Sequence, residues 1–322
     1  MTSYREAGVD LDAADRHTDS IGSSVTRTWT NEVVGGFGGF AAGVRVPTGY
    51  VDPVLMMTTD GVGTKLEIAR RAGLWGGVGR DLVAMCVDDL AAAGSKPIGF
   101  VDYLAVGSLD AERDTTIVDS IADACLEASC PLLGGETAEH PGVMEPAAVD
   151  LAGAALGVVE SAEVLGPERV GAGDLIVGLM SPNLRSNGFS LVRAVMGADV
   201  DKHAGVLVAP SVIYSPDVLQ VAALVNSAAH ITGGGLASNI ARALPPGLGA
   251  DIDTESWVRP EVFDLVASYG VAEAEMWRTF NNGIGFCLVA PEVNVAEIMS
   301  GLAAHNPAVV GRVREGDGVV LT

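Results

Sequence analysis

Apolar runs and amphipathic stretches alternate along most of this chain, and their order predicts a mixture of strands and helices. Apolar runs predict strands at 54–58, 98–107, 131–135, 151–159, 174–180, 283–290 and 308–313. Amphipathic stretches predict helices at 64–71, 80–94, 110–129, 189–195, 215–229, 260–270 and 294–305. Gly94 is expected to close the helix of 80–94 as a C-terminal cap. The first 30 residues are polar and mixed, and no element is predicted there.

The order of these elements favours mixed sheets over a strictly alternating parallel sheet, so we expect an α+β arrangement. Residues 161–174 (SAEVLGPERVGAGD) are rich in glycine, proline and charge, which is typical of a domain boundary. We therefore predict an N-terminal domain of residues 1–165 and a C-terminal domain of residues 166–322. A chain of 322 residues is long enough to give both a hydrophobic core.

Composition and charge narrow the classes of function. A hydrophobic fraction of 48% excludes a disordered chain, and a net charge of −22 makes nucleic acid and anionic lipid poor partners. Four cysteines show no CxxC pair or zinc spacing, and Cys86 and Cys287 lie in apolar runs typical of a core. The N-terminus lacks a signal peptide's apolar stretch, and no apolar window approaches about 18 residues. We expect a reduced, cytoplasmic protein.

Residues 59–65 (TDGVGTK) combine an acid, two glycines, a hydroxyl and a lysine directly after an apolar run. The members of this loop with candidate chemistry are Asp60, Gly61, Gly63, Thr64 and Lys65. The combination suits phosphate and a metal ion, although a turn at the end of a strand has the same composition. It is not a Walker A loop, because Thr64 precedes Lys65 instead of following it.

Residues 35–41 (GGFGGFA) fit the dinucleotide-binding pattern formally, but Pro47 and Gly49 interrupt the helix that this pattern requires. Two interpretations stay open for this segment. It is either a glycine-rich flap over phosphates, formed by Gly36, Gly38 and Gly39, or a plain mobile loop.

Acidic residues in the first half are candidates for binding a metal. On the helix of 80–94, Asp81 and Asp88 share a face, and Asp89 lies about 80° away between Val87 and Leu90. Its apolar neighbours raise the chance that Asp89 is held inward. Glu136 follows a glycine pair after a predicted strand. Asp60, Asp89 and Glu136 together would suit Mg²⁺, which prefers carboxylate oxygens, whereas His140 is expected to be structural or to lie at the rim.

Two loops of the second half place small polar residues before helices. They contain Ser186, Asn187 and Gly188 in RSNGFS (185–190), and Thr232, Gly233, Gly234 and Gly235 in TGGGLASN (232–239). Helix N-termini attract phosphate through their free N–H groups and the helix dipole. Ordinary N-capping by Ser186 or Ser238 is the alternative.

The succession of motifs is more specific than any one of them. The motifs are SYREAGVD, GGFGG, TDGVGTKL, DLVAMCVDDL, DYLAVG, GGETAEHPG, SNGFSLVR, TGGGLASNIARALP and RTFNNGIG. From about Tyr4 to the C-terminus, the chain resembles the phosphoribosylformylglycinamidine cyclo-ligases of purine biosynthesis. The resemblance implies an ATP-dependent homodimer, with an N-terminal α+β domain whose strands join the partner's in a barrel and a C-terminal α/β domain.

The resemblance also implies the chemistry and its residues. ATP would activate the formyl oxygen of formylglycinamidine ribonucleotide, and a nitrogen would then close the ring as phosphate leaves. The resemblance implies catalytic roles for Asp60, Lys65, Asp89, Glu136 and Arg185. It also implies that Asp60, Asp89 and Glu136 bind Mg²⁺. The resemblance further implies that the loops at 61–65, 186–188 and 232–235 contact phosphate and substrate.

The chain departs from the family pattern at several positions. Gly22 stands where the family commonly has lysine, and Arg185 where it commonly has histidine. Residues 75–77 and 143–150 also differ from the usual motifs. Arg185 keeps a positive charge for phosphate but cannot act as an acid or base at neutral pH. Four interpretations of these departures stay open: a divergent orthologue, a paralogue of the same ATP-binding superfamily, a weakened enzyme, or a non-catalytic nucleotide-binding homologue. The lack of a cysteine near the N-terminus counts against selenophosphate synthetase.

Overall fold

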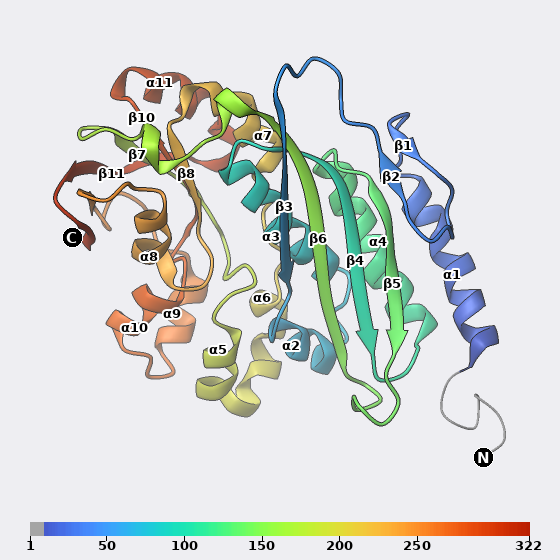
Figure 1. The fold of residues 1–322 in the computed structure, drawn as a ribbon. Coiled ribbons are helices and arrows are strands. Elements are labelled where there is room, and N and C mark those ends of the chain that lie inside the picture. Colours follow the sequence, from blue (N-terminus) through green and yellow to red (C-terminus); the bar gives the residue numbers. More distant parts are fainter. Residues whose placement is uncertain (1–9) are drawn as a thin grey trace.

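The computed structural model describes residues 10–322, which form two sheets flanked by helices (Figure 1). The larger elements of the first half are α1 (Leu11–Thr26), β3 (Pro53–Gly61), α2 (Lys65–Ala72), α3 (Val78–Ala92), β4 (Lys96–Val106), α4 (Ala111–Glu127), β5 (Leu132–Glu139) and β6 (Val149–Glu160). A small antiparallel pair is formed by β1 (Val33–Val34) and β2 (Gly43–Val44). The main sheet has the order β3-β6-β4-β5, with β4 and β5 parallel and the other pairs antiparallel.

One face of this four-stranded sheet is covered and the other is open. Helix α3 packs against β3, β4 and β6, and in Figure 1 the strands lie in front of α3 and α4. The sequence alternates accordingly along β4, where Phe100, Asp102 and Leu104 are buried while Val101 and Tyr103 are exposed. The sheet therefore presents an inner face to the helices and leaves an outer face uncovered.

The second half forms a six-stranded sheet with the order β12-β9-β11-β7-β10-β8. Its strands are β7 (Leu175–Met180), β8 (Ser227–His230), β9 (Leu248–Ile252), β10 (Ile284–Ala290), β11 (Ala308–Glu315) and β12 (Gly318–Leu321). Its helices are α5 (Phe189–Met196), α6 (Ala204–Leu207), α7 (Ser215–Val221), α8 (Gly235–Arg242), α9 (Glu261–Ala267), α10 (Glu273–Thr279) and α11 (Glu292–Gly301). Short 3-10 turns lie at Ser161–Glu163, Pro167–Arg169, Gly197–His203, Ala222–Leu224 and Ala303–His305.

The expectation of mixed sheets is confirmed in both halves, but strict α/β order in the second half is not found. Four of its strand pairs are antiparallel and only β9 with β12 is parallel. The reason is that β10 and β11 both pair with β7 by running back along it, as strands of an α+β domain do. A barrel shared with a partner remains a prediction.

Two local predictions were wrong. The helix expected at 215–229 ends at Val221, because Val225 is extended and residues 227–230 pair with β10 as β8. Sheet pairing thus overrides the helical pattern there. Helix α1 was not predicted, although Asp10 caps it by accepting a hydrogen bond from the Ala13 N–H.

Other predictions for single segments and residues are confirmed. Gly94 adopts a left-handed φ of 74° just after α3, and all four cysteines are free and buried. Among residues 10–322, no helix is both long and apolar enough to cross a membrane.

Candidate active site

Two aspartates meet where β3 approaches α3. Asp60 is the next-to-last residue of β3, and Asp89 lies in the last turns of α3, which packs on the inner face of that strand. Thr58, two residues before Asp60 and therefore on the same face of β3, donates a hydrogen bond of 3.1 Å from its hydroxyl to Oδ2 of Asp89. The structure thus brings Asp60 and Asp89 together, as the sequence predicted.

The two carboxyl groups differ in their electrostatics. Burial raises the pKa of Asp60, and the negative charge of Asp89 raises it further, although a hydrogen bond from the Gly61 N–H opposes this. Burial also acts to raise the pKa of Asp89, but hydrogen bonds from His230 and Thr58 outweigh it and hold that pKa below its ordinary value. Asp89 is therefore a stabilised carboxylate, and Asp60 is the acid that gains most from a nearby cation.

His230 and Arg185 connect this acid pair to the second half of the chain. Nδ1 of His230, the last residue of β8, lies 2.8 Å from Oδ1 of Asp89. Its Nε2 lies 2.9 Å from Nη2 of Arg185, which also donates to Oδ2 of Asp88 at 2.8 Å. Thr58, Asp89, His230, Arg185 and Asp88 thus form one continuous chain of hydrogen bonds.

Arg185 was expected to contact the cleft, but it does not. Its side chain is fully buried, donates to the carbonyl of Val212 and stacks over the Tyr214 ring with 4.9 Å between Cζ and the centroid. Its backbone adopts a left-handed φ of 58°. A guanidinium held in this way positions His230 and cannot reach a phosphate, so the expected phosphate contact is corrected.

Lys65 requires the same correction. It is fully buried, and its Nζ lies 2.7 Å from Oδ2 of Asp81 and donates to the carbonyls of Arg185 and Ala209. These partners fill its three donor positions, so Lys65 joins the two halves of the chain instead of binding phosphate. The shared face of Asp81 and Asp88 is confirmed, since each carboxylate accepts backbone N–H groups from the segment that includes Ser211 and Tyr214.

Glu136 does not join the acid pair within one chain. Asp60 pairs with Gly153, Gly153 with Asp102, and Asp102 with Gly135, so Asp60 and Gly135 lie at opposite edges of the sheet. Three strand spacings separate them by about 14 Å. Glu136 is the next residue on β5 and points to the opposite, outer face. Among the described residues, no group of three or more His, Cys, Asp or Glu side chains could hold a metal.

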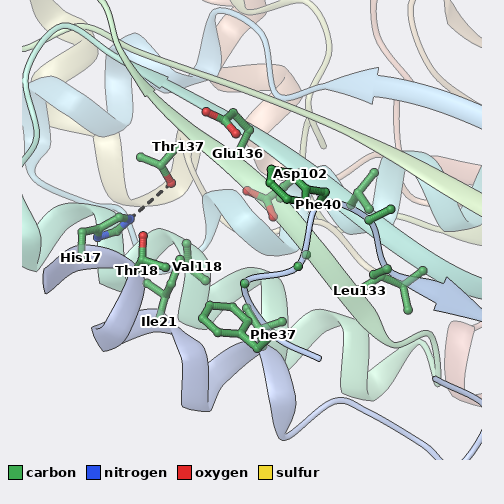
Figure 2. A pocket seen from close by; sticks show the side chains of 18 of the residues that line it. His17, Thr18, Ile21, Phe37, Phe40, Asp102, Val118, Leu133, Glu136 and Thr137 are labelled. Carbon is green, nitrogen blue, oxygen red and sulfur yellow. Dashed lines mark hydrogen bonds between the residues drawn. The ribbon is translucent and has the colours of Figure 1, made fainter. Parts of the chain in front are cut away.

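The glycine-rich loop forms the lid of a separate cavity of about 530 Å³ (Figure 2). The cavity lies between α1, the loop at 36–42, α4 and the middle of β4 and β5, and Glu136 is among its lining residues. Gly36, Gly38 and Gly39 are all part of its lining. Gly22 of α1 lies beside Phe37, one of the lining residues: a Cβ on Gly22 would lie 3.0 Å from the Phe37 ring, so a larger side chain here would displace that ring. The glycine loop therefore lines a cavity, and its role as a flap over phosphates stays a prediction.

The two small-residue loops of the second half lie side by side. A Cβ on Gly233 would lie 3.5 Å from Oδ1 of Asn187. Nδ2 of Asn239 donates to the carbonyls of Thr232, Gly233 and Gly235 and so fixes the second loop. Gly188, Gly234 and Gly235 all adopt left-handed φ angles.

Ordinary N-capping does not explain these loops, because neither Ser186 nor Ser238 caps α5 or α8 through its side chain. The hydroxyl of Ser186 is buried without a hydrogen-bond partner. Gly61 and Gly63 continue β3 into the turn before α2, and the Thr64 hydroxyl lies 3.1 Å from the Ser190 hydroxyl at the start of α5. The loops of both halves therefore meet near the same place.

Sequence reasoning missed His230, Asp102 and His17. His230 stands at the end of a short strand directly before the glycine run 233–235, a position at which functional side chains often lie. Asp102 interrupts the apolar strand 98–107. An acid inside such an apolar run is unusual, and it could have been recognised in the sequence as a candidate functional residue. His140, expected to be structural or at the rim, lies 3.0 Å from the Tyr103 hydroxyl.

Comparison with known proteins assigns the chain to a family. The models of the AIR synthase related protein match here, the N-terminal domain at residues 38–159 and the C-terminal domain at residues 171–322. The chain is 42% identical to the phosphoribosylformylglycinamidine cyclo-ligase of Synechococcus sp. (strain CC9311), over 98% of this chain and 96% of that protein. The chain belongs to the phosphoribosylformylglycinamidine cyclo-ligase family. The cyclo-ligase of Xanthomonas oryzae pv. oryzae (strain PXO99A) is also 42% identical, over 95% and 94% of the two chains.

Solved structures extend the cyclo-ligase fold to more distant proteins. Thiamine-monophosphate kinase from Stenotrophomonas maltophilia superimposes with a TM-score of 0.66 at 18% identity, over 94% of each chain. The E. coli hydrogenase maturation protein HypE gives a TM-score of 0.69 at 16% identity, over 96% of this chain and 93% of that one. At these identities the likeness shows a shared fold alone.

Proposed function

We propose that this chain closes the imidazole ring of aminoimidazole ribonucleotide from formylglycinamidine ribonucleotide, using ATP, in purine biosynthesis. The observation that carries this proposal is the 42% identity to a cyclo-ligase across both halves of the chain. The paired carboxylates Asp60 and Asp89, beside loops rich in glycine and small hydroxyls, suit the handling of a triphosphate.

The reaction has two balanced steps. The formyl oxygen attacks the γ-phosphorus of ATP, so that an O–P bond forms, the bond between Pγ and the β–γ bridging oxygen breaks, and ADP leaves. A nitrogen of the amidine then attacks the activated formyl carbon, and the C–O bond breaks to release phosphate as the nitrogen loses a proton. Transfer of one methylene proton to the imine nitrogen gives the aromatic aminoimidazole. The protein's contribution is to position both substrates and to neutralise charge.

We propose that Asp60 and Asp89 hold a magnesium ion. The raised pKa of Asp60, caused by burial and by the charge of Asp89, supports this proposal, because a cation would stabilise the charged forms of both acids. When bound, Mg²⁺ would neutralise charge on the phosphates of ATP. The hydrogen bonds of Thr58 and His230 hold the Asp89 carboxylate in place. Glu136 of the same chain does not fit this ion, because it lies at the far edge of the sheet and on its outer face.

The remaining loops have positions that suit anion binding. Gly61, Gly63 and Thr64 lie beside the start of α5, where Ser186, Asn187 and Gly188 form the turn. Thr232, Gly233, Gly234 and Gly235 adjoin that turn through Asn187. We propose that these loops bind phosphate groups of ATP or of the ribonucleotide, and that Gly36, Gly38 and Gly39 cover the nucleotide.

We also propose that the chain is a homodimer formed through its first half. The outer face of the four-stranded sheet exposes Leu55 at 52%, Met57 at 76%, Val101 at 41% and Tyr103 at 42%. A contiguous apolar sheet face of this kind favours burial against a second copy, and two-fold pairing is the commonest way to achieve it.

The test is turnover by the purified protein. ADP release and formation of the aromatic amine product should both require ATP, Mg²⁺ and formylglycinamidine ribonucleotide. ADP release only with another amide would support a paralogous enzyme instead, and no release with any amide would support a non-catalytic homologue. Growth of a purine auxotroph lacking this step, on medium without purine, would show the same activity in cells.

A further inference from the structure

The backbone that leads into the turn at 186–188 is strained. Arg185 adopts a φ of 58°, a left-handed conformation that costs free energy for a residue with a Cβ. It is the first central residue of a turn in which the N–H of Asn187 lies 3.5 Å from the carbonyl oxygen of Leu184. Glycine, asparagine or aspartate usually occupies such a position. Strain of this kind persists only where surrounding contacts hold it in place.

Two buried side chains hold the backbone of Arg185. Nζ of Lys65 donates a hydrogen bond of 2.9 Å to the Arg185 carbonyl, and Oδ1 of Asn183 accepts one of 3.0 Å from the Arg185 N–H. Both side chains also reach the next segment, since Lys65 donates to the carbonyl of Ala209 and Nδ2 of Asn183 donates to that of Pro210. The strained peptide is therefore braced against this segment through both its carbonyl and its N–H.

The contact with Lys65 fixes the direction of the next N–H group in the chain. The carbonyl and the N–H of a trans peptide point in opposite directions, so holding the Arg185 carbonyl on Lys65 turns the N–H of Ser186 away from the lysine. Within residues 10–322 this N–H has no hydrogen-bond acceptor, and the Ser186 hydroxyl is buried without a partner. Two unused donors on one residue, just before the N-terminus of α5, suit an anion.

Lys65 fixes the turn by its position and does not supply charge to it. Its Nζ lies 2.7 Å from Oδ2 of Asp81, and both side chains are fully buried, so the two charges neutralise each other. Lys65 begins α2 in the first half of the chain, whereas the turn at 186–188 belongs to the second half. The Thr64 hydroxyl, one residue earlier, lies 3.1 Å from the Ser190 hydroxyl. Lys65 and Thr64 thus tie the loop after β3 to the start of α5.

We propose that Lys65 is a positioning residue of the phosphate-binding turn. From behind the turn it holds the Arg185 peptide in its strained conformation, and so directs the N–H and the hydroxyl of Ser186 to a phosphate group. The inference rests on the proposed function, because ATP and the ribonucleotide are the two sources of that phosphate group. Within residues 10–322 no other donor holds the Arg185 carbonyl, so loss of Lys65 lets the peptide relax and turns the Ser186 N–H away from the ligand.

The test measures binding of ATP with Mg²⁺ and, separately, of formylglycinamidine ribonucleotide by calorimetry on the full-length protein. Lys65→Met alone leaves the buried charge of Asp81 unpaired, so it is combined with Asp81→Asn. The combined variant should bind one of the two compounds about tenfold more weakly or worse, with a matching rise in its KM and kcat within about threefold of wild type. The compound that loses affinity is the one whose phosphate the turn holds.

A second variant and a control separate this role from a general structural one. Ser186→Ala should weaken binding of the same compound by about fivefold or more without lowering the midpoint of thermal unfolding, because the hydroxyl has no partner in the free protein. Lys202→Met removes an exposed lysine paired with Asp199 and should leave both dissociation constants unchanged.

Three results would overturn the inference: unchanged binding in either variant, equal losses for both compounds in the combined variant, or a fall in kcat with unchanged dissociation constants. A wild type that binds both compounds but does not turn over would contradict only the proposed function. A wild type with full turnover whose combined variant binds both compounds normally would contradict only the role of Lys65.

Discussion

Nη2 of Arg185 donates a hydrogen bond of 2.9 Å to Nε2 of His230. A guanidinium carries no acceptor, so Nε2 must be the unprotonated nitrogen of the ring, and the hydrogen of the neutral imidazole sits on Nδ1. Nδ1 therefore donates to Asp89, one of the two acids in the candidate metal site. Through this contact a residue that departs from the family pattern determines the tautomer of His230 and the orientation of Asp89.

Arg185→Ala should destabilise the fold and weaken activity indirectly. Asp88 would keep its backbone donors from Tyr214 and Ser215 but lose its buried counter-charge, which typically costs about 3–5 kcal/mol in the free energy of unfolding. Denaturant unfolding measures this loss. Arg71→Ala removes an arginine from a partly exposed pair with Asp201 and should cost less than about 1 kcal/mol. Equal losses in the two variants would contradict the buried role of Arg185.

Asp60→Asn should lower ATP-dependent turnover by about a hundredfold or more while the fold stays intact. The change removes one of two carboxylates proposed to bind Mg²⁺. It should not reduce stability at neutral pH, because burial and Asp89 already make the charged form of Asp60 unfavourable and raise its pKa. Turnover measured against Mg²⁺ concentration tests this, with Asp123→Asn as the exposed control. Wild-type activity of Asp60→Asn at limiting Mg²⁺ would show that the metal assignment is wrong.

Asp102 should make the stability of the protein depend on pH. Its pKa of about 7 in the folded state lies above the ordinary value of 3.8, so the folded protein binds more protons than the unfolded chain between these values. The free energy of unfolding should therefore fall as pH rises from about 4 to about 7, by an amount on the order of 4 kcal/mol, and then level off. Unfolding of wild type and Asp102→Asn at several pH values measures this contribution, which should be missing in the variant. Parallel pH profiles for the two proteins would refute it.

Met57→Glu should convert the proposed dimer to a monomer. Met57 lies on the outer face of β3 with 76% of its surface exposed, and a buried unpaired carboxylate at a subunit interface would be strongly unfavourable. Light scattering at micromolar concentration gives the mass of each protein. Val293→Glu places the same charge on α11, at a position that is 87% exposed and remote from this sheet, and should leave the dimer unchanged. A monomeric wild type would contradict the proposal.

The sequence by itself determined most local structure and the class of chemistry. Apolar runs predicted β4 and β10, whose residues are mostly buried, and also β3, which alternates between half-buried and exposed residues. Gly94 marked the end of α3. The ordered motifs identified the family, since that information lies in residue type and succession and does not depend on contacts. The sequence also grouped Asp60 and Asp89 as acids suited to Mg²⁺, but their nearness depends on the packing of α3 against β3, because α2 lies between these two elements in the chain.

Only the tertiary structure decided which charged groups face the cleft. The sequence predicted Lys65 and Arg185 to bind phosphate. Both side chains are instead fully buried, because Asp81 and Asp88 of α3 form ion pairs with them at the contact between the two halves. Asp89 and His230, 141 positions apart, touch because β8 packs against α3. Glu136 lies at the far edge of the sheet because β6, late in the sequence, inserts between β3 and β4. Strand order and the burial of a charge depend on contacts between distant segments, and local periodicity carries no record of them.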